Sequence, residues 1–198
     1  YSYSTLVPNC SEGTFYSLGG GDLLEENLTP LRGYWINLTE GDSITFSGER
    51  LLPTTLTLRS KWNLIGSISE QTTLSDPNEV IIPGTLYGYN SGYVPAETIE
   101  SGRGYWVNTL SEGDVELVRY DPDGADGTPT LFQQPLRSPS VLSEFDEIQF
   151  ISGDELLSQL YFHGEFGVDV HPLQTQLPPI PPKGSFDVRT ENGEWITE

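Results

Sequence analysis

The chain carries one stretch of sequence twice, and this repeat limits the folds open to it more than any other feature. The segment LRGYWIN at 31–37 returns as GRGYWVN at 102–108. The copies stay in register without a gap from 13–37 to 84–108, an offset of 71 residues, and ten of these 25 positions are identical. Such a pattern is typical of a tandem duplication of one structural unit.

The repeated unit has the composition of a β structure. The 198 residues include 21 Gly and 15 Pro, and the apolar segments between them are short and rich in β-branched and aromatic residues. A helical turn is suggested only at 154–160. The pattern predicts an all-β fold, with tandem duplicated β-sandwich or barrel-like modules followed by a C-terminal β segment. Strands are predicted at 43–47, 54–58, 62–68, 80–82, 85–89, 105–108, 115–119, 148–152, 159–163 and 185–189.

Composition divides the chain into four parts. We predict a first β repeat at 1–48, a second at 49–120, an acidic linker at 121–130 and a C-terminal β segment at 131–198. The linker DPDGADGTPT is rich in turn residues. The last part contains LPPIPPKG at 177–184, which favours a stiff polyproline II stretch that braces the fold.

The two copies are unequal. The second is preceded by KWNLIGSIS at 61–69, an alternating strand pattern, whereas the counterpart of this segment in the first copy falls before residue 1. We therefore predict that the first repeat lacks its N-terminal strand. An open sheet edge invites pairing, so the missing strand is expected from elsewhere in the chain or from a neighbouring molecule.

The repeated strand places two large aromatic residues next to each other. Adjacent residues of a strand face opposite sides, so Tyr105 and Trp106 do not point into the same core. Our interpretation is that the Trp packs in the core and the Tyr is half-exposed, and the alternative is a platform on which sugar rings stack. The preceding glycine, Gly33 or Gly104, suits a close approach of two backbones. Arg32 and Arg103 are expected to pair with an acid or to stack on a ring.

Charge excludes two classes of partner. The chain has 9 basic and 29 acidic residues, a net charge of −20, so a nucleic acid or an anionic bilayer would repel it. No apolar run approaches the roughly 20 residues of a membrane span, and we predict no membrane insertion. Cys10 is the single cysteine, which excludes an internal disulfide. Methionine is absent, also at position 1, which suggests a processed chain.

Few residues point to chemistry. Asp121, Asp123 and Asp126 could supply oxygen ligands to calcium, although their spacing is not that of an EF-hand loop and the alternative is a solvated turn. No other cofactor is predicted. His163, Glu165 and His171 could be drawn as a metal site, but their spacing matches no established pattern of metal ligands. The sequence has no G-x-S-x-G nucleophile motif, so we predict no catalytic residues and no enzymatic activity.

Two segments resemble parts of known families. KWNLIGSIS at 61–69, followed by GTLYGYNSGYVPAETIESGRGYWVN at 84–108, resembles a module that recurs in large secreted bacterial proteins. The tail LYFHGEFGVDVHPLQTQLPPIPPKGSFDVRT at 160–190 resembles the segment that precedes the C-terminal sorting domain in proteins of the type IX secretion route. The resemblance implies an extracellular or cell-surface protein, with such modules in stalk or accessory positions.

These observations predict a non-enzymatic, extracellular structural or adhesive protein, a cell-surface or filament subunit that self-associates into a polymer by β-strand exchange. The alternative is a carbohydrate-binding accessory module of a secreted multidomain protein, with a glycan as its partner. Its ring-stacking residues would be exposed tyrosines of the second repeat, and the candidates are Tyr87, Tyr89, Tyr93 and Tyr105.

Overall fold

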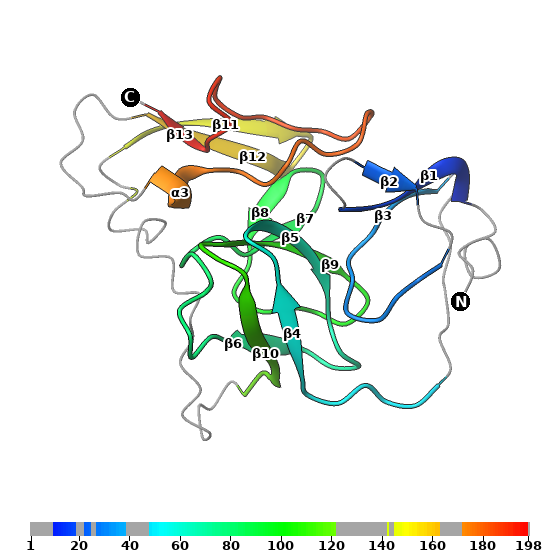
Figure 1. Cartoon of the computed structure of the whole chain (residues 1–198). Helices are drawn as coiled ribbons and strands as arrows, with labels where there is room; N and C mark the ends of the chain where they lie inside the picture. Colours follow the sequence, from blue (N-terminus) through cyan, green and yellow to red (C-terminus); the bar gives the residue numbers. More distant parts are fainter. Residues whose placement is uncertain are drawn as a thin grey trace.

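The computed structural model describes residues 10–18, 22–24, 27–38, 48–121, 142, 145–162 and 172–197. Strands make up 47% of these residues and helices 4%, which confirms the all-β prediction. The strands in the described ranges form four sheets (Figure 1), three of three strands and one of four.

The second repeat is a β-sandwich. One sheet has the order β4-β10-β6 and the other β5-β9-β7-β8. Their facing surfaces enclose a core with Leu74, Leu86, Val107 and Leu117 at its centre. The strands are β4 (Thr54–Leu58), β5 (Lys61–Gly66), β6 (Thr72–Ser75), β7 (Tyr87–Tyr89), β8 (Tyr93–Pro95), β9 (Gly104–Thr109) and β10 (Gly113–Arg119).

The first repeat folds with the register of the second. Its sheet has the order β2-β1-β3, with β1 (Cys10–Leu18), β2 (Asp22–Leu24) and β3 (Trp35–Leu38). Tyr16 lies opposite Leu24 and Trp35 in this sheet. The residues 71 positions later repeat the arrangement, because Tyr87 lies opposite Pro95 and Trp106. The duplication in the sequence is therefore a duplication of strand pairing.

Among the described residues, the fourth strand of this unit occurs in the second copy only. In the second repeat, β5 pairs with β9 along six residue pairs, from Lys61 opposite Thr109 to Gly66 opposite Gly104. In the first repeat, β3 pairs with β1 and is the last strand of its sheet among the described residues.

The two repeats are joined where the chain enters β3. The Gly33 N–H donates to the Leu64 carbonyl (3.1 Å), and the Gly66 N–H donates to the Leu31 carbonyl (2.8 Å). A Cβ atom on Gly33 would lie 2.7 Å from the Ile65 carbonyl oxygen. Only glycine fits this approach, which confirms the close backbone contact predicted at Gly33.

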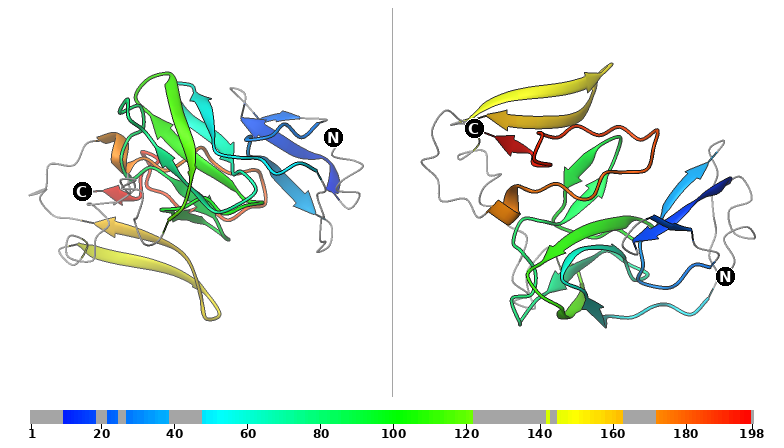
Figure 2. Two further views of the ribbon diagram at one scale, coloured as in Figure 1. Left: turned by 90° about the horizontal axis from the view of Figure 1, so that it is seen from below. Right: turned by 45° about the horizontal axis from the view of Figure 1, so that its top comes forward.

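The C-terminal segment forms a sheet of its own. It contains β11 (Asp146–Ser152), β12 (Glu155–Phe162), the short helix α3 (Pro172–Thr175) and β13 (Ile196–Thr197). β11 and β12 are antiparallel and joined by the two-residue turn Gly153–Asp154, whereas β13 runs parallel to β12. The helical turn suggested at 154–160 is wrong, since Asp154 belongs to the hairpin turn and 155–160 belong to β12. Figure 2 shows the β11–β12 hairpin projecting from the body of the molecule.

The C-terminal segment covers the outer face of the β5-β9-β7-β8 sheet, so this sheet is covered on both sides (Figure 1). Tyr105 packs in the sandwich core and Trp106 packs on the opposite face, and both are buried. The interpretation of a buried Trp beside a half-exposed Tyr is therefore wrong for the second copy. In the first copy, both Tyr34 and Trp35 are half-buried.

Candidate functional site

The outer face of the four-stranded sheet gathers several aromatic residues of the repeats into one cluster with the C-terminal segment. Trp106 lies 6.4 Å from Trp62 between ring centroids, with the two rings nearly perpendicular. Tyr161 and Trp195 of the C-terminal segment meet in the same edge-to-face way at 5.8 Å. Such pairs stabilise a cluster beyond the burial of their area. The buried members are Tyr87, Tyr93, Trp106, Tyr161, Leu177, Trp195 and Ile196.

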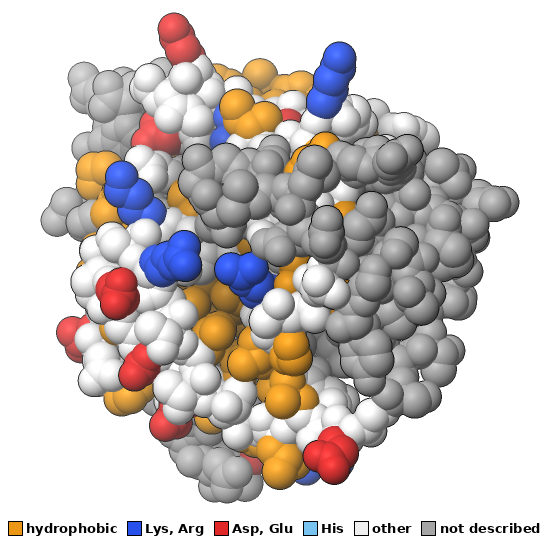
Figure 3. All heavy atoms as spheres, turned by 45° about the vertical axis from the view of Figure 1, so that its right-hand side comes forward, with side chains coloured by type: hydrophobic (Ala, Val, Ile, Leu, Met, Phe, Trp, Pro, Cys, Tyr) orange, Lys and Arg blue, Asp and Glu red, His pale blue; other side chains and the backbone are white. Residues whose placement is uncertain are grey.

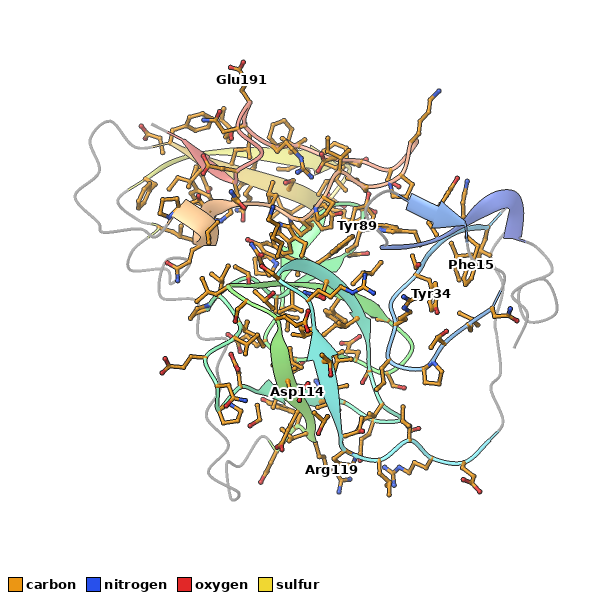
Figure 4. All side chains as sticks on the ribbon, in the orientation of Figure 1. Phe15, Tyr34, Tyr89, Asp114, Arg119 and Glu191 are labelled. Carbon is orange, nitrogen blue, oxygen red and sulfur yellow. The ribbon has the colours of Figure 1, made fainter. Side chains whose placement is uncertain are left out.

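Two tyrosine hydroxyls fasten the C-terminal segment to this face. Tyr89 donates a hydrogen bond to the Phe186 carbonyl (2.8 Å), and Tyr93 donates to the Pro179 carbonyl (2.6 Å). In Figure 4 Tyr89 lies between the sheet and the C-terminal segment. Burial is the main cause that raises the pKa of both tyrosines above the ordinary value, most strongly at Tyr93. Neutral hydroxyl groups thus hold this joint.

An arginine supports the same joint from the C-terminal side. The Arg189 guanidinium donates to both carboxylate oxygens of Asp187 (2.6 and 2.8 Å) and to the Pro178 carbonyl (2.9 Å). Its central carbon lies 6.0 Å from the centroid of the Tyr93 ring. The proline-rich stretch is thus held against the sheet, as a bracing role predicts.

The structure does not expose the tyrosines predicted to stack on sugars. Tyr87, Tyr93 and Tyr105 are 0%, 7% and 5% exposed, and only Tyr89 is half-buried. Tyr105 also faces the sandwich core, whereas Tyr87 and Tyr93 face the C-terminal segment. The four residues therefore do not form one open platform, because Tyr105 faces the opposite side and a third layer covers the face on which the other three lie.

A groove of about 580 Å³ lies between the repeats, and we call it the inter-repeat groove. The first repeat lines it with Tyr34 and Trp35, and the second with Tyr89 and with the exposed Asn90 and Glu97. Trp35 meets Tyr89 edge-to-face at 4.7 Å, and Tyr34 stacks on Phe15 at 4.8 Å (Figure 4). Half-buried rings beside free polar side chains are the features of a small-ligand site.

Arg103, also at this groove, pairs with Glu100 at 3.1 Å, as predicted for this arginine. Sequence reasoning missed Trp35 as a site residue. The available signal was that Trp35 belongs to the copy for which the sequence predicts no fourth strand.

A second groove, of about 500 Å³, follows the edge of the sandwich between β4 and β5, and we call it the edge groove. Its apolar wall includes Leu31, Leu56 and Ile65, and Arg32, Arg59 and Lys61 also line it. These are three of the nine basic residues of the chain. No acidic residue occurs among the described residues that line it.

The predicted calcium ligands are only partly placed. Asp121 is half-buried and follows β10, whereas Asp123 and Asp126 lie outside the described residues. His163, Glu165 and His171 also lie outside them. Within the described ranges, no group of three or more His, Cys, Asp or Glu side chains is placed to hold a metal ion. Nor does a helix in those ranges have the length and apolar character needed to span a membrane.

Comparisons with known proteins return no match. No protein-family model, no curated protein and no solved structure is similar to this chain.

Proposed function

We propose that the chain is a non-enzymatic structural or adhesive protein of the cell surface or extracellular space, and that it assembles by β-strand addition. One observation carries the proposal. The edge of β3 that corresponds to the β5-covered edge of β9 has no strand beside it among the described residues. A segment from a second molecule would complete the first repeat as β5 completes the second.

The backbone geometry identifies the groups that such a segment would meet. The Leu64 carbonyl and the Gly66 N–H point away from β9, toward residues 31–33. Along an antiparallel strand, the N–H and C=O groups of successive residues point to opposite sides. The backbone groups of Ile65 and Asn63 therefore point toward β9, where Ile65 bonds to Tyr105 and Asn63 bonds to Val107. Ile36 is the counterpart of Val107, so its N–H faces the open edge of β3.

The first prediction concerns this edge. We expect Ile36→Pro to abolish assembly of the full chain through this edge, because proline removes the donor that faces the open edge while the bonds between β3 and β1 remain. Sedimentation velocity and electron microscopy at physiological salt measure the outcome, since salt screens the repulsion between acidic subunits. Wild type should form linear assemblies, and the variant should lose the association that depends on this edge.

The matched control places proline where it does not touch this edge. Leu52→Pro lies in an exposed segment before β4 and should leave assembly unchanged. Equal assembly by wild type and Ile36→Pro, or a monomeric wild type at high concentration, would count against the proposal.

The inter-repeat groove favours a second candidate, the binding of a neutral oligosaccharide. Trp35 and Tyr89 are half-buried and offer partly open ring edges and faces, and Asn90 and Glu97 are exposed beside them. Sugars bind where apolar ring faces meet aromatic side chains and a few polar groups fix the hydroxyls.

The second prediction tests this candidate. The double variant Asn90→Ala with Glu97→Ala should weaken glycan binding about tenfold or more. Each substitution removes a hydrogen-bonding group, and one hydrogen bond contributes about 1 kcal/mol net to the binding free energy. Glycan-array screening followed by calorimetry on the best ligand measures the loss. Glu116→Ala, an exposed acid on β10 outside the groove, is the control. Unchanged affinity in the double variant would exclude this groove.

A further inference from the structure

The edge groove has the features of a receptor for an acidic, apolar β-strand. β4 and β5 are the terminal strands of their two sheets and lie next to each other in the chain. Residues 31–33 cover only the Leu64–Gly66 end of β5. Along Lys61–Asn63 no described strand lies on that side, so backbone groups and the apolar wall of the groove are open to a further strand.

Two cations of this groove are unpaired. Arg59 and Lys61 are exposed, and neither has an ion-pair partner among the described residues. In a chain with 29 acidic residues, two neighbouring cations without a partner are unusual. Figure 3 shows one face of the molecule on which Lys and Arg side chains border a hollowed hydrophobic area. Such a surface attracts a negatively charged, apolar ligand.

The turn that presents these cations is held in place. Lys61 has a φ of 75°, a conformation that a non-glycine residue keeps only when its surroundings impose it. The Asn63 side chain donates to the carbonyls of Arg59 and Lys61 (2.8 and 2.9 Å) and accepts from the Arg59 N–H. The Thr109 hydroxyl lies within hydrogen-bond distance of the same two carbonyls. The site is therefore preorganised.

The chain also carries a segment of the complementary chemistry. β11 is the edge strand of its sheet, and the hairpin that it forms with β12 projects from the body (Figure 2). Ile148, Ile151 and Leu156 are 49%, 58% and 45% exposed, a large apolar surface for a hairpin. Asp146, Glu147, Asp154 and Glu155 add negative charge, and 142–162 contains no lysine or arginine.

We propose that the β11–β12 hairpin of one molecule docks in the edge groove of a second copy of this chain. The exposed isoleucines of β11 lie against the apolar wall, and the acids of the hairpin meet Arg59 and Lys61. Since the projecting hairpin points away from its own body, the contact forms between molecules. Donor and acceptor are different surfaces, so the contact is heterologous and propagates. It uses a different edge from β3 and goes beyond the proposed function.

Two complementary variants of the full chain test the contact. Arg59→Glu with Lys61→Glu blocks the groove, and Ile148→Lys with Ile151→Lys blocks the hairpin at exposed positions. Each variant alone should associate about 10- to 100-fold more weakly than wild type, as expected for losing close charge pairs or anchoring side chains. Mixed together in the Ile36→Pro background, which removes any contact through β3, the two should form a one-to-one complex and no longer species, because each retains the surface that the other lacks.

A charge-matched control separates this contact from general repulsion. Arg119→Glu with Lys183→Glu makes the same change in net charge at exposed positions outside the groove and should associate like wild type. If both blocked variants assemble like wild type, the hairpin contact is overturned, while the β3 proposal stands or falls on Ile36→Pro. If Ile36→Pro assembles and the blocked variants do not, the hairpin contact stands without the β3 edge. A wild type that never associates overturns both.

Discussion

Trp106→Ala should reduce the free energy of unfolding by about 3–5 kcal/mol, the range for truncating a buried tryptophan. Trp106 is 4% exposed and touches both the repeat and the C-terminal segment through the aromatic cluster. The loss comes mainly from packing, because the large apolar indole leaves a cavity between the sheet and the C-terminal segment. Chemical denaturation followed by far-ultraviolet circular dichroism measures it.

The duplication supplies the matched control for this experiment. Trp35 occupies the same position in the first copy but is half-buried, and it meets only the edge of the cluster through Tyr89 and Tyr93. Trp35→Ala should therefore cost about 1–2 kcal/mol, the value of partly burying one large side chain. An equal loss in both variants would show that the C-terminal segment contributes little to the burial of Trp106.

Local sequence patterns were sufficient to predict the strands that pair with other strands of the same repeat. The predicted strand at 54–58 matches β4, and the prediction at 115–119 falls within β10. The inequality of the copies was also predicted, because the counterpart of the alternating segment at 61–69 falls before residue 1, and β3 is the last strand of its sheet among the described residues. These features depend on the period of side chains along a strand, which the sequence contains directly.

The errors arose where distant segments decide the structure. Tyr105 and Trp106 are both buried because the C-terminal segment forms a third layer, and nothing in 102–108 encodes that layer. Residues 185–189 were predicted as a strand, yet they form no ladder and are held by Arg189 through Asp187 and Pro178. The predicted tyrosine platform failed for the same reason, since exposure depends on what packs over a face.

The same reasoning applies to the hairpin and to the grooves. The leucines of 154–160 are spaced for a helical turn, but pairing with β11 through the Gly153–Asp154 turn takes precedence over that local preference. Neither groove could be predicted, because each is formed by residues from separate strands. The sequence did contain Arg59 and Lys61 as a basic pair in an acidic chain, and that contrast was the available signal.

The C-terminal joint should weaken in alkali, and Tyr93 should be the main cause. An unfolded tyrosine loses its proton near pH 10, whereas burial raises the pKa of Tyr93 above that value. Above about pH 10 the unfolded state therefore binds fewer protons than the folded state, so stability falls as pH rises, by up to about 1.4 kcal/mol per pH unit. Below that pH the Tyr93 hydroxyl is protonated in both states, so it does not make the stability depend on pH. Tyr89 adds to it in the same direction.

Tyr93→Phe isolates this effect, because repulsion among the 29 acidic residues is the same in both proteins. At neutral pH the variant should be less stable by about 1 kcal/mol, since the hydrogen bond to the Pro179 carbonyl is lost. In alkali the phenylalanine has no proton to lose, so the two stability curves should cross near about pH 11. Urea denaturation between pH 8 and 12 measures both curves. Parallel curves would mean that the Tyr93 hydroxyl ionises as readily in the folded state as in the unfolded one, and that the C-terminal segment does not shield it from water.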